Sequence, residues 1–471
     1  MPPADHRSAL APLRHPAFRF LAAGRGVSTL GNGVAPIALA FAVLDLTGSL
    51  NDLGLVVGAR TLFNVIFLLF GGVIADRLPR HLVMVGSGVL SGCSQAVVAT
   101  LVLSHSASIP ALMVLSAANG TFAAFALPAS SALMPQTVPE ELRQSANALN
   151  RMIGNTTQIL GASLGGVLVA TVGSGWGLAA DSASFLLSAL LFLRVRVPIA
   201  PAPAPASTDA DVQDADASTD TEDTATPSPT PQAAAGKRAG LISELREGWQ
   251  EFASRTWVWV VVVAFGFINA ALAGCASVLG PAVADATFGR SWWGGVLAAE
   301  TAGAVLGGLV ALRWRPQRLL LVGVACVGAG VALPLGLALH IQVYVLAAAG
   351  FLCGMCLEQF GVAWETSLQQ EVPGDRLARV YSYDMVGSFV AIPVAQVAIG
   401  PLASAFGVRD TLLGAAVVIL LGTLAMLAVR DVRTLRVRRA DGAPDRAPDG
   451  APGGPLPDTA AGGELPDPVT G

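Results

Sequence analysis

Twelve long apolar runs dominate this sequence, and each is long enough to cross a membrane as a helix. A bilayer core takes about 20 helical residues to cross. A helix also satisfies its own backbone hydrogen bonds inside lipid. The sequence therefore predicts an all-α integral membrane protein with 12 transmembrane helices in a lipid bilayer. The expected spans lie near residues 18–44, 53–75, 82–104, 108–134, 146–172, 175–195, 256–287, 292–312, 318–339, 341–365, 380–405 and 408–429.

The composition agrees with a membrane protein and excludes several other classes. Of the 471 residues, 53% are hydrophobic and 13% charged, which is more apolar than a soluble domain needs. The net charge of −4 does not indicate binding to nucleic acid. The only lysine, Lys237, is followed by Arg238, so a GxxxxGK[ST] phosphate loop is impossible. The five cysteines lie in apolar runs, and the CxxC at Cys353 and Cys356 is interpreted as helix packing. We expect no enzymatic activity, cofactor, metal or nucleic-acid partner.

A polar segment divides the chain into two groups of six spans. Residues 198–240 are rich in Pro, Ala, Asp, Thr and Ser, which predicts a disordered linker. On the side of the membrane opposite the linker, Arg290 and Arg409 are the only basic residues, so both termini and the linker are expected in the cytoplasm. The expected parts are a tail at 1–16, a half at 17–197, the linker, a half at 241–430 and a disordered tail at 431–471.

An internal repeat supports the division into six plus six spans. The chain reads LMPQTVPEELRQSANALN after the fourth span and LQQEVPGDRLARVYSYDM after the tenth. Val138 and Pro139 fall on Val372 and Pro373. Two parallel halves of this kind are related by an axis along the membrane normal.

The connection between the second and third spans, GGVIADRLPRH at residues 71–81, carries an unusual concentration of charge. Gly72 lets two helices approach closely, and Asp76 is placed to accept from backbone N–H groups or an arginine. Arg77 and Arg80 mark the cytoplasmic side. The alternative interpretation is that any loop on that side carries arginines.

This connection resembles the signature G-x-x-x-D-R-x-G-R-R/K of the major facilitator superfamily. Pro79 stands where the family usually has glycine, and His81 where it has arginine or lysine. The resemblance implies a transporter of two six-helix halves that open alternately to the two sides. It also implies a cytoplasmic gate in which the motif latches the halves together, formed here by Gly72, Asp76, Arg77 and Arg80.

A second motif, GASLGG at 161–166, resembles the antiporter motif G-P-x-x-G-G, with Ala162 in place of proline. The matching residues are Gly161, Gly165 and Gly166, although small residues four apart are also ordinary packing positions in membrane helices. Together with GVSTLGNGVAPIALAFAVLDLTGS and WETSLQQEVP, the pattern over 14–430 resembles bacterial drug/proton exporters, including siderophore and macrolide exporters. This resemblance implies that spans 3, 6, 9 and 12 face lipid and that the others line the cavity.

Ionisable side chains inside the spans are the candidates for function, because they are costly in a bilayer. Arg25, Arg60, Glu300 and Glu358 are the four that we single out. A proton-coupled exporter needs a carboxyl group that binds and releases a proton, and both glutamates are candidates. They could instead be static partners of the two arginines.

Amides and aromatic rings within the spans suggest how a ligand would be held. The amides could donate hydrogen bonds to a substrate or pair across helices, and they include Asn32, Gln158, Asn269, Gln359 and Gln396. The rings favour an amphiphilic ligand over a sugar, and they include Phe265, Phe267, Phe360 and Trp364.

The sequence thus predicts a secondary active transporter in the bacterial cell membrane. We expect it to act as a monomer that exports a hydrophobic or amphiphilic small molecule, such as a drug, antibiotic or secondary metabolite, in exchange for protons. A receptor or scaffold with the same fold is an alternative, and so is a nutrient or siderophore transporter of different direction. The direction of transport rests on the resemblance alone.

Overall fold

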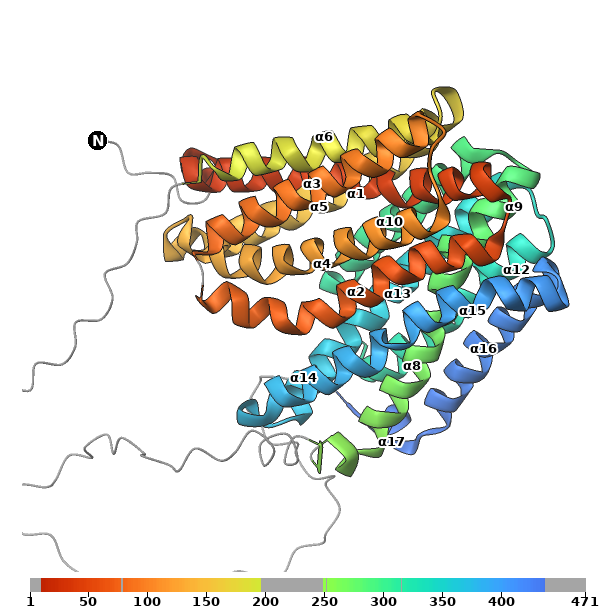
Figure 1. Ribbon diagram of the computed structural model, residues 1–471. Helices are drawn as coiled ribbons and strands as arrows, with labels where there is room; N and C mark the ends of the chain where they lie inside the picture. Colours follow the sequence, from red (N-terminus) through yellow and green to blue (C-terminus); the bar gives the residue numbers. More distant parts are fainter. Residues whose placement is uncertain (1–9, 78, 196–248, 251, 315, 437–471) are drawn as a thin grey trace, which may run out of the picture. The chain divides into compact units, whose positions relative to one another are not determined.

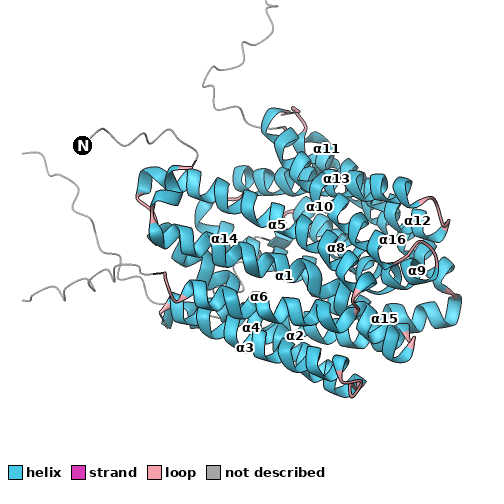
Figure 2. Ribbon diagram, turned by 90° about the horizontal axis from the view of Figure 1, so that it is seen from above, coloured by secondary structure: helices cyan, strands magenta, loops and turns pink. Residues whose placement is uncertain are grey.

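The computed structural model describes residues 10–77, 79–195, 249–250, 252–314 and 316–436. Regular structure in these ranges is entirely helical, and 12 helices are long and apolar enough to cross a membrane. The all-α fold with twelve spans is therefore confirmed (Figures 1 and 2). The expected linker at 198–240 lies outside the described residues, as do residues 1–9 and 437–471 of the two tails.

Each predicted span of the first half is a single helix. The helices are α1 (Pro16–Thr47), α2 (Leu50–Arg77), α3 (Arg80–Leu103), α4 (Ile109–Leu133), α5 (Arg143–Thr171) and α6 (Ser174–Phe192). Short 3-10 turns precede α1 and lead from α4 into α5, namely η1 (Ala11–Arg14), η2 (Met134–Gln136) and η3 (Glu140–Leu142). Ala11 is buried, so the last residues of the expected N-terminal tail pack onto the bundle.

In the second half, three spans are single helices, and these are α10 (Arg290–Arg313), α13 (Val343–Glu371) and α16 (Val408–Ala428). The other three spans are segmented. The first span of this half consists of α8 (Thr256–Gly274), the π-helix η4 (Cys275–Leu279) and α9 (Gly280–Ala286). The third consists of α11 (Leu319–Val327), the 3-10 turn η5 (Gly328–Val331) and α12 (Ala332–Ala338). The fifth consists of α14 (Gly374–Phe389) and α15 (Ala391–Phe406).

The ordered chain continues past residue 430, where the second half was expected to end. Residues of the expected tail form α17 (Arg430–Thr434), which packs against α11 and α16. Val432 is fully buried there. Burial of this side chain explains why the first turn of the expected tail is helical.

Short turns join consecutive spans at one end of the bundle, on the right-hand side of Figure 1. We call this the hairpin end and the opposite one, where residues 10 and 436 lie, the termini end. Each of the six hairpin-end turns contains one residue with positive φ, between 50° and 106°. Such a backbone favours glycine, which occupies four of the turns. In chain order these residues are Gly48, His105, Gly173, Gly289, His340 and Gly407, so the two halves repeat the same pattern.

Helix packing repeats between the halves as well. In the first half α1 packs against α5 and α6, α2 against α4, and α3 against α4 and α6. In the second half α8 packs against α15 and α16, α10 against α13, α11 against α13 and α12 against α16. Every one of these contacts has its counterpart six spans later, which confirms two six-helix halves.

The two halves share one core near the hairpin end and have separate cores near the termini end. The shared core joins residues such as Phe41 and Leu53 to Trp293 and Ile399. At the termini end, one buried cluster around Phe18 belongs to the first half, and another around Trp257 belongs to the second. Among the residues that the structure describes, the main contacts between the halves are α5 against α10 and α2 against α15, and they lie near the hairpin end.

Candidate functional site: a polar cavity in the first half

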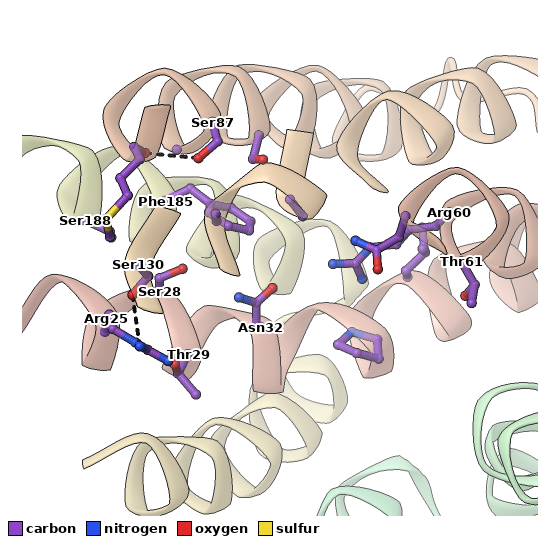
Figure 3. A pocket seen from close by; sticks show the side chains of 18 of the residues that line it. Arg25, Ser28, Thr29, Asn32, Arg60, Thr61, Ser87, Ser130, Phe185 and Ser188 are labelled. Carbon is purple, nitrogen blue, oxygen red and sulfur yellow. Dashed lines mark hydrogen bonds between the residues drawn. The ribbon is translucent and has the colours of Figure 1, made fainter. Parts of the chain in front are cut away.

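A cavity of about 530 Å³ lies among the helices of the first half. Its walls come from α1, α2, α3, α4 and α6, and Ser277 and Gln396 of the second half complete the lining. Figure 3 shows the polar side chains that converge there. Its lining combines two arginines, amides and hydroxyls with apolar side chains such as Leu39, Val57 and Phe185.

One face of α1 supplies the most polar wall of this cavity. Arg25, Thr29, Asn32 and Pro36 follow one another at intervals of three or four residues, which places them on the same helix face. Nη1 of Arg25 donates a hydrogen bond of 2.9 Å to the Ser130 hydroxyl on α4 (Figure 3). Three expected site residues, Arg25, Asn32 and Arg60, thus line one cavity.

A second cavity, of about 550 Å³, adjoins the first toward the termini end. It lies between α1 and α5 and shares Arg25 and Thr29 with the first. Its other lining residues are polar except Gly154, and they include Asn147, Arg151 and Gln158. Arg25 therefore stands where the two cavities meet.

The second half reaches the cavity through an irregular stretch of its first span. The π-helix η4 precedes Pro281, which lacks the N–H that a regular helix would bond to the carbonyl of residue 277. Ser277 lies within η4 and accepts a 3.1 Å hydrogen bond from Nε2 of Gln396 on α15. Such π-bulges often occur at functional sites.

The spans that were expected to face lipid include two that line the cavity. Met84, Ser87 and Ser91 of α3 are cavity residues, and so are Phe185 and Ser188 of α6. Spans 3 and 6 therefore line the cavity on one side, while their other sides carry exposed apolar residues such as Leu90 and Leu190. Serine is small enough to let α3 and α6 pack closely. The Ser87 hydroxyl donates a 3.1 Å hydrogen bond to the Met84 carbonyl oxygen of its own helix (Figure 3).

The most important residue that sequence reasoning missed is Asp181 on α6. Its side chain is fully buried, and neither carboxylate oxygen has a hydrogen-bond partner in the described structure. It packs against α1 at Gly31, where an added Cβ would lie 2.6 Å from Oδ1 of Asp181. Asp181 also interacts electrostatically with Arg60 on α2. Asp181 is an acidic residue within an apolar span, and by that criterion it is as strong a candidate as the two glutamates.

The glutamates expected to carry a proton lie in the second half, where α10 packs on α13. Glu300 lies against Gly350, and Glu358 lies against Gly307 on the facing helix. Gln359 is buried and donates from Nε2 to the Gly307 carbonyl oxygen. None of the three lines either cavity, so Gln359 pairs across helices in this conformation.

The alternative of a static ion pair is not realised in this conformation. Among the described residues, no ion pair joins Glu300 or Glu358 to Arg25 or Arg60. The carboxylates and the arginines belong to different halves, and the core that the described residues of the two halves share lies near the hairpin end. A pair between them remains a prediction for other states.

The aromatic side chains that were expected to line a cavity are elsewhere. Phe360 and Trp364 are 3% and 8% exposed and belong to the core of the second half. Phe265 packs on Phe360 with ring centroids 4.5 Å apart, whereas Phe267 is 61% exposed. The expectation is wrong for Phe360 and Trp364, because these rings fill the space between helices.

The predicted cytoplasmic gate is only partly described. The backbone of Gly72, Asp76 and Arg77 continues α2, but their side chains lie outside the described part of the structure. Arg80 begins α3 after Pro79, whose φ of −56° is an ordinary value for proline. The substitution of proline for glycine thus fits this turn, and the latch role of the motif stays a prediction.

The antiporter-like glycines lie at close contacts between helices. Gly161 packs against Leu30 and Gly33 of α1, and a Cβ added at Gly165 would lie 2.9 Å from the Cα of Val34. Gly166 faces the other half instead. A Cβ there would lie 2.8 Å from the Ser291 carbonyl oxygen and 3.0 Å from the Cα of Gly294 on α10. The motif therefore packs α5 against both α1 and α10.

An ion-pair cluster joins the halves at the hairpin end. Arg290 at the start of α10 makes two hydrogen bonds, of 2.6 and 3.0 Å, to the carboxylate of Asp45 on α1. Its Nε donates to Asp285 at 2.6 Å, and its guanidinium lies 4.8 Å from the centre of the Phe41 ring. We call these residues the hairpin-end clamp. They tie α1 of the first half to α9 and α10 of the second.

The profile of the Major Facilitator Superfamily matches residues 21–395, which is most of the chain. The chain belongs to this superfamily. It is thus a multi-pass membrane transporter by family and by fold, and the matched range contains the second cavity and all lining residues of the first except Gln396.

Sequence relatives of this transporter include siderophore exporters. The enterobactin exporter EntS of Citrobacter koseri is 31% identical over 187 residues, which are 38% of this chain and 44% of the exporter. The enterobactin exporter EntS of Salmonella typhimurium is 30% identical over the same length. The chain thus spans less than half the length of these relatives.

Solved structures share the fold at low sequence identity. The nucleoside transporter NupG superposes with a TM-score of 0.66 at 11% identity, over 88% of this chain and 98% of that one. A bacterial homolog of the human lysosomal transporter Spinster superposes with a TM-score of 0.63 at 15% identity, over 88% and 96%. These likenesses support the transporter fold of the whole bundle.

Proposed function

We propose that this transporter exports an amphiphilic small molecule across a bacterial cell membrane in exchange for protons, and that it works as a monomer without chemical modification of its cargo. The observation that carries the proposal is a cavity of mixed polar and apolar lining within a scaffold whose halves, in the described residues, share a core near one end and have separate cores near the other.

The size and lining of the cavity suit a drug-sized ligand. Ligand pockets are typically about 300–1,000 Å³ and combine apolar walls with a few polar groups that orient the ligand. Here Leu39, Val57 and Phe185 provide apolar surface, while Asn32 and Asn64 provide amides.

Alternating access would require the halves to separate at the hairpin end and close at the termini end. The contacts that must break are the hairpin-end clamp, the approach of Gly166 to Gly294, and the packing of α2 on α15. With the basic residues on the cytoplasmic side, the described conformation would be open toward the cytoplasm. Loading from inside the cell is what an exporter needs, and the EntS relatives are exporters by name.

Proton coupling is the finer part of the proposal, and three carboxyl groups are candidates. Glu300 and Glu358 are the two expected from the sequence, and both face the α10–α13 contact. Asp181 is the third, since a fully buried carboxylate without hydrogen bonds is costly to keep charged. Its neighbour Arg60 lines the cavity, so a change in the proton of Asp181 would be felt by a ligand there.

The test is an efflux screen followed by transport in vesicles. Cells with and without the protein are compared for retention of fluorescent amphiphiles, and a compound that is exported is then studied in proteoliposomes under an imposed pH gradient. We expect gradient-driven transport that stops when a protonophore is added. Transport that continues without a proton gradient would contradict the coupling, and absence of export for every compound would contradict the direction.

Substitutions then separate the candidates. Glu300→Gln, Glu358→Gln and Asp181→Asn each remove a titrating group and keep its shape. The variant that still binds ligand but loses pH-driven transport identifies the coupling group. Glu140→Gln is the matched control, because Glu140 is an exposed residue paired with Arg143 outside the cavities. If all three variants and their combination keep coupled transport, none of them carries the proton.

A further inference from the structure

The charged groups that line the two cavities are all of one sign. Arg25 and Arg60 line the first cavity, and Arg25 and Arg151 line the second. No aspartate or glutamate is among the described lining residues of either. A cavity lined by positive charge attracts negative ligands and repels cations.

The two arginines of the first cavity differ in how their charge is balanced. Arg60 lies within electrostatic range of Asp181, which is fully buried on α6. Arg25 has no such carboxylate among the described residues, and its one hydrogen bond there goes to the neutral hydroxyl of Ser130. A guanidinium has five N–H donors, so most of those on Arg25 are available to another acceptor.

An arginine without an anion is expensive inside a membrane protein, and such residues usually pair or face a water-filled cavity. Arg25 faces two cavities, and its neighbours there are donors as well. In Figure 3, Ser28 and Thr29 lie beside Arg25, and Asn32 lies between Arg25 and Arg60. The site therefore offers several hydrogen-bond donors around one unbalanced positive charge.

We propose that the transported molecule carries an oxyanion group, such as a carboxylate, which binds the guanidinium of Arg25 while its apolar body occupies the first cavity. This inference rests on the proposed transport function and adds the charge of the substrate to it. The planar guanidinium suits the geometry, because it binds carboxylate and phosphate oxygens through two parallel hydrogen bonds. Leu39, Val57 and Phe185 form the apolar surface that the rest of the ligand contacts.

The test uses three probes that share one fluorophore and differ in charge. Dansylglycine is an anion, dansylamide is neutral and dansylcadaverine is a cation. Binding to the full-length protein in lipid nanodiscs is followed by dansyl fluorescence, without any ion gradient. We expect dansylglycine to bind more tightly than dansylamide, and dansylcadaverine to bind least.

Substitutions at Arg25 isolate the charge from the shape. A hydrogen bond to a charged group changes affinity about 10- to 100-fold. Arg25→Gln should therefore lower the affinity for dansylglycine by that factor and change the affinity for dansylamide by no more than about twofold. Arg25→Lys keeps the charge but not the planar fork and should recover part of the preference. Arg143→Gln is the control, because Arg143 is exposed and pairs with Glu140 outside both cavities.

Three results would overturn the proposal. One is equal or tighter binding of dansylcadaverine. Another is an equal loss of affinity for all three probes in the Arg25→Gln variant, while the Arg25→Lys variant remains folded. The third is recovery of Arg25→Gln by neutralising Glu300 or Glu358, which would show that the counter-ion of Arg25 is a carboxylate of this chain. Because these measurements need no gradient, a failure of proton-coupled export would leave them interpretable.

Discussion

Replacing Gly166 with alanine should push the two halves apart at the hairpin end. The added Cβ would lie 2.8 Å from the Ser291 carbonyl oxygen and 3.0 Å from the Cα of Gly294. Ordinary Cβ contacts begin at 3.4 Å. The helices α5 and α10 would therefore have to separate by about 0.6 Å at this point, because both obstructing groups are backbone and cannot rotate away.

The strain acts on one conformation more than on the other. Overpacking of this kind costs about 1–3 kcal/mol. The cost applies where α5 and α10 are in contact and is relieved when the hairpin end opens. A difference of about 1–3 kcal/mol shifts a two-state equilibrium about 5- to 150-fold. Gly166→Ala should thus populate a state that is open at the hairpin end.

Distances between spin labels at the hairpin end provide the assay. Val172 and Phe406 are 54% and 67% exposed, lie in different halves and suit labelling in a variant without the native cysteines. We expect Gly166→Ala to increase the population of longer distances. Gly414→Ala is the neutral control, because nothing lies within 4 Å of a Cβ there.

A second control separates strain between the halves from strain within one of them. Gly165→Ala strains the contact of α5 with Val34 of α1, which lies in the same half, so it should lower the melting temperature without moving the labels apart. Unchanged distances in a fully folded Gly166→Ala protein would refute the reasoning.

Three further predictions concern the gates and the linker. Arg290→Gln removes the hairpin-end clamp, and because the clamp is partly exposed we expect the free energy of opening to fall by about 1 kcal/mol or less. Distances between the same spin labels should show this shift, and high salt should have a similar effect on the unsubstituted protein. Arg409→Gln is the control and should have no effect. Asp76→Asn should leave expression normal and slow transport, because a latch acts between states; unchanged transport rates would argue against a latch. Deleting residues 203–233 should leave the extracted protein monodisperse with a similar melting temperature, and a loss of several degrees would show that the segment contributes to folding.

The spans and their repeat were predictable because membrane thickness sets the length of every helix. Each of the twelve predicted spans corresponds to a helix or a segmented helix of the structure. The match of Val138 and Pro139 with Val372 and Pro373 correctly indicated two similar halves. The segmentation of the second half was not predicted, because a break at η4 leaves the hydropathy of the span unchanged.

The partners of the charged residues were not predictable from hydropathy. Asp181 is fully buried against Gly31 although it lies in a span that was expected to face lipid. In a membrane, both the lipid-facing and the buried face of a helix are apolar, so the pattern of apolar residues does not tell them apart. Small residues such as Ser87 and Ser188 mark the buried face instead.

The sequence by itself determined that this is a twelve-span, two-half membrane protein, since length and apolarity are local properties of each segment. Only the tertiary structure decided that Arg25 and Arg60 share a cavity, that Asp181 lies within electrostatic range of Arg60, and that Glu300 and Glu358 pack between α10 and α13. It also decided which end is packed shut, through residues more than 200 positions apart such as Asp45 and Arg290. The physical reason is that the energy of a charge in a bilayer depends on what lies within a few ångströms of it, and packing between distant helices sets those neighbours.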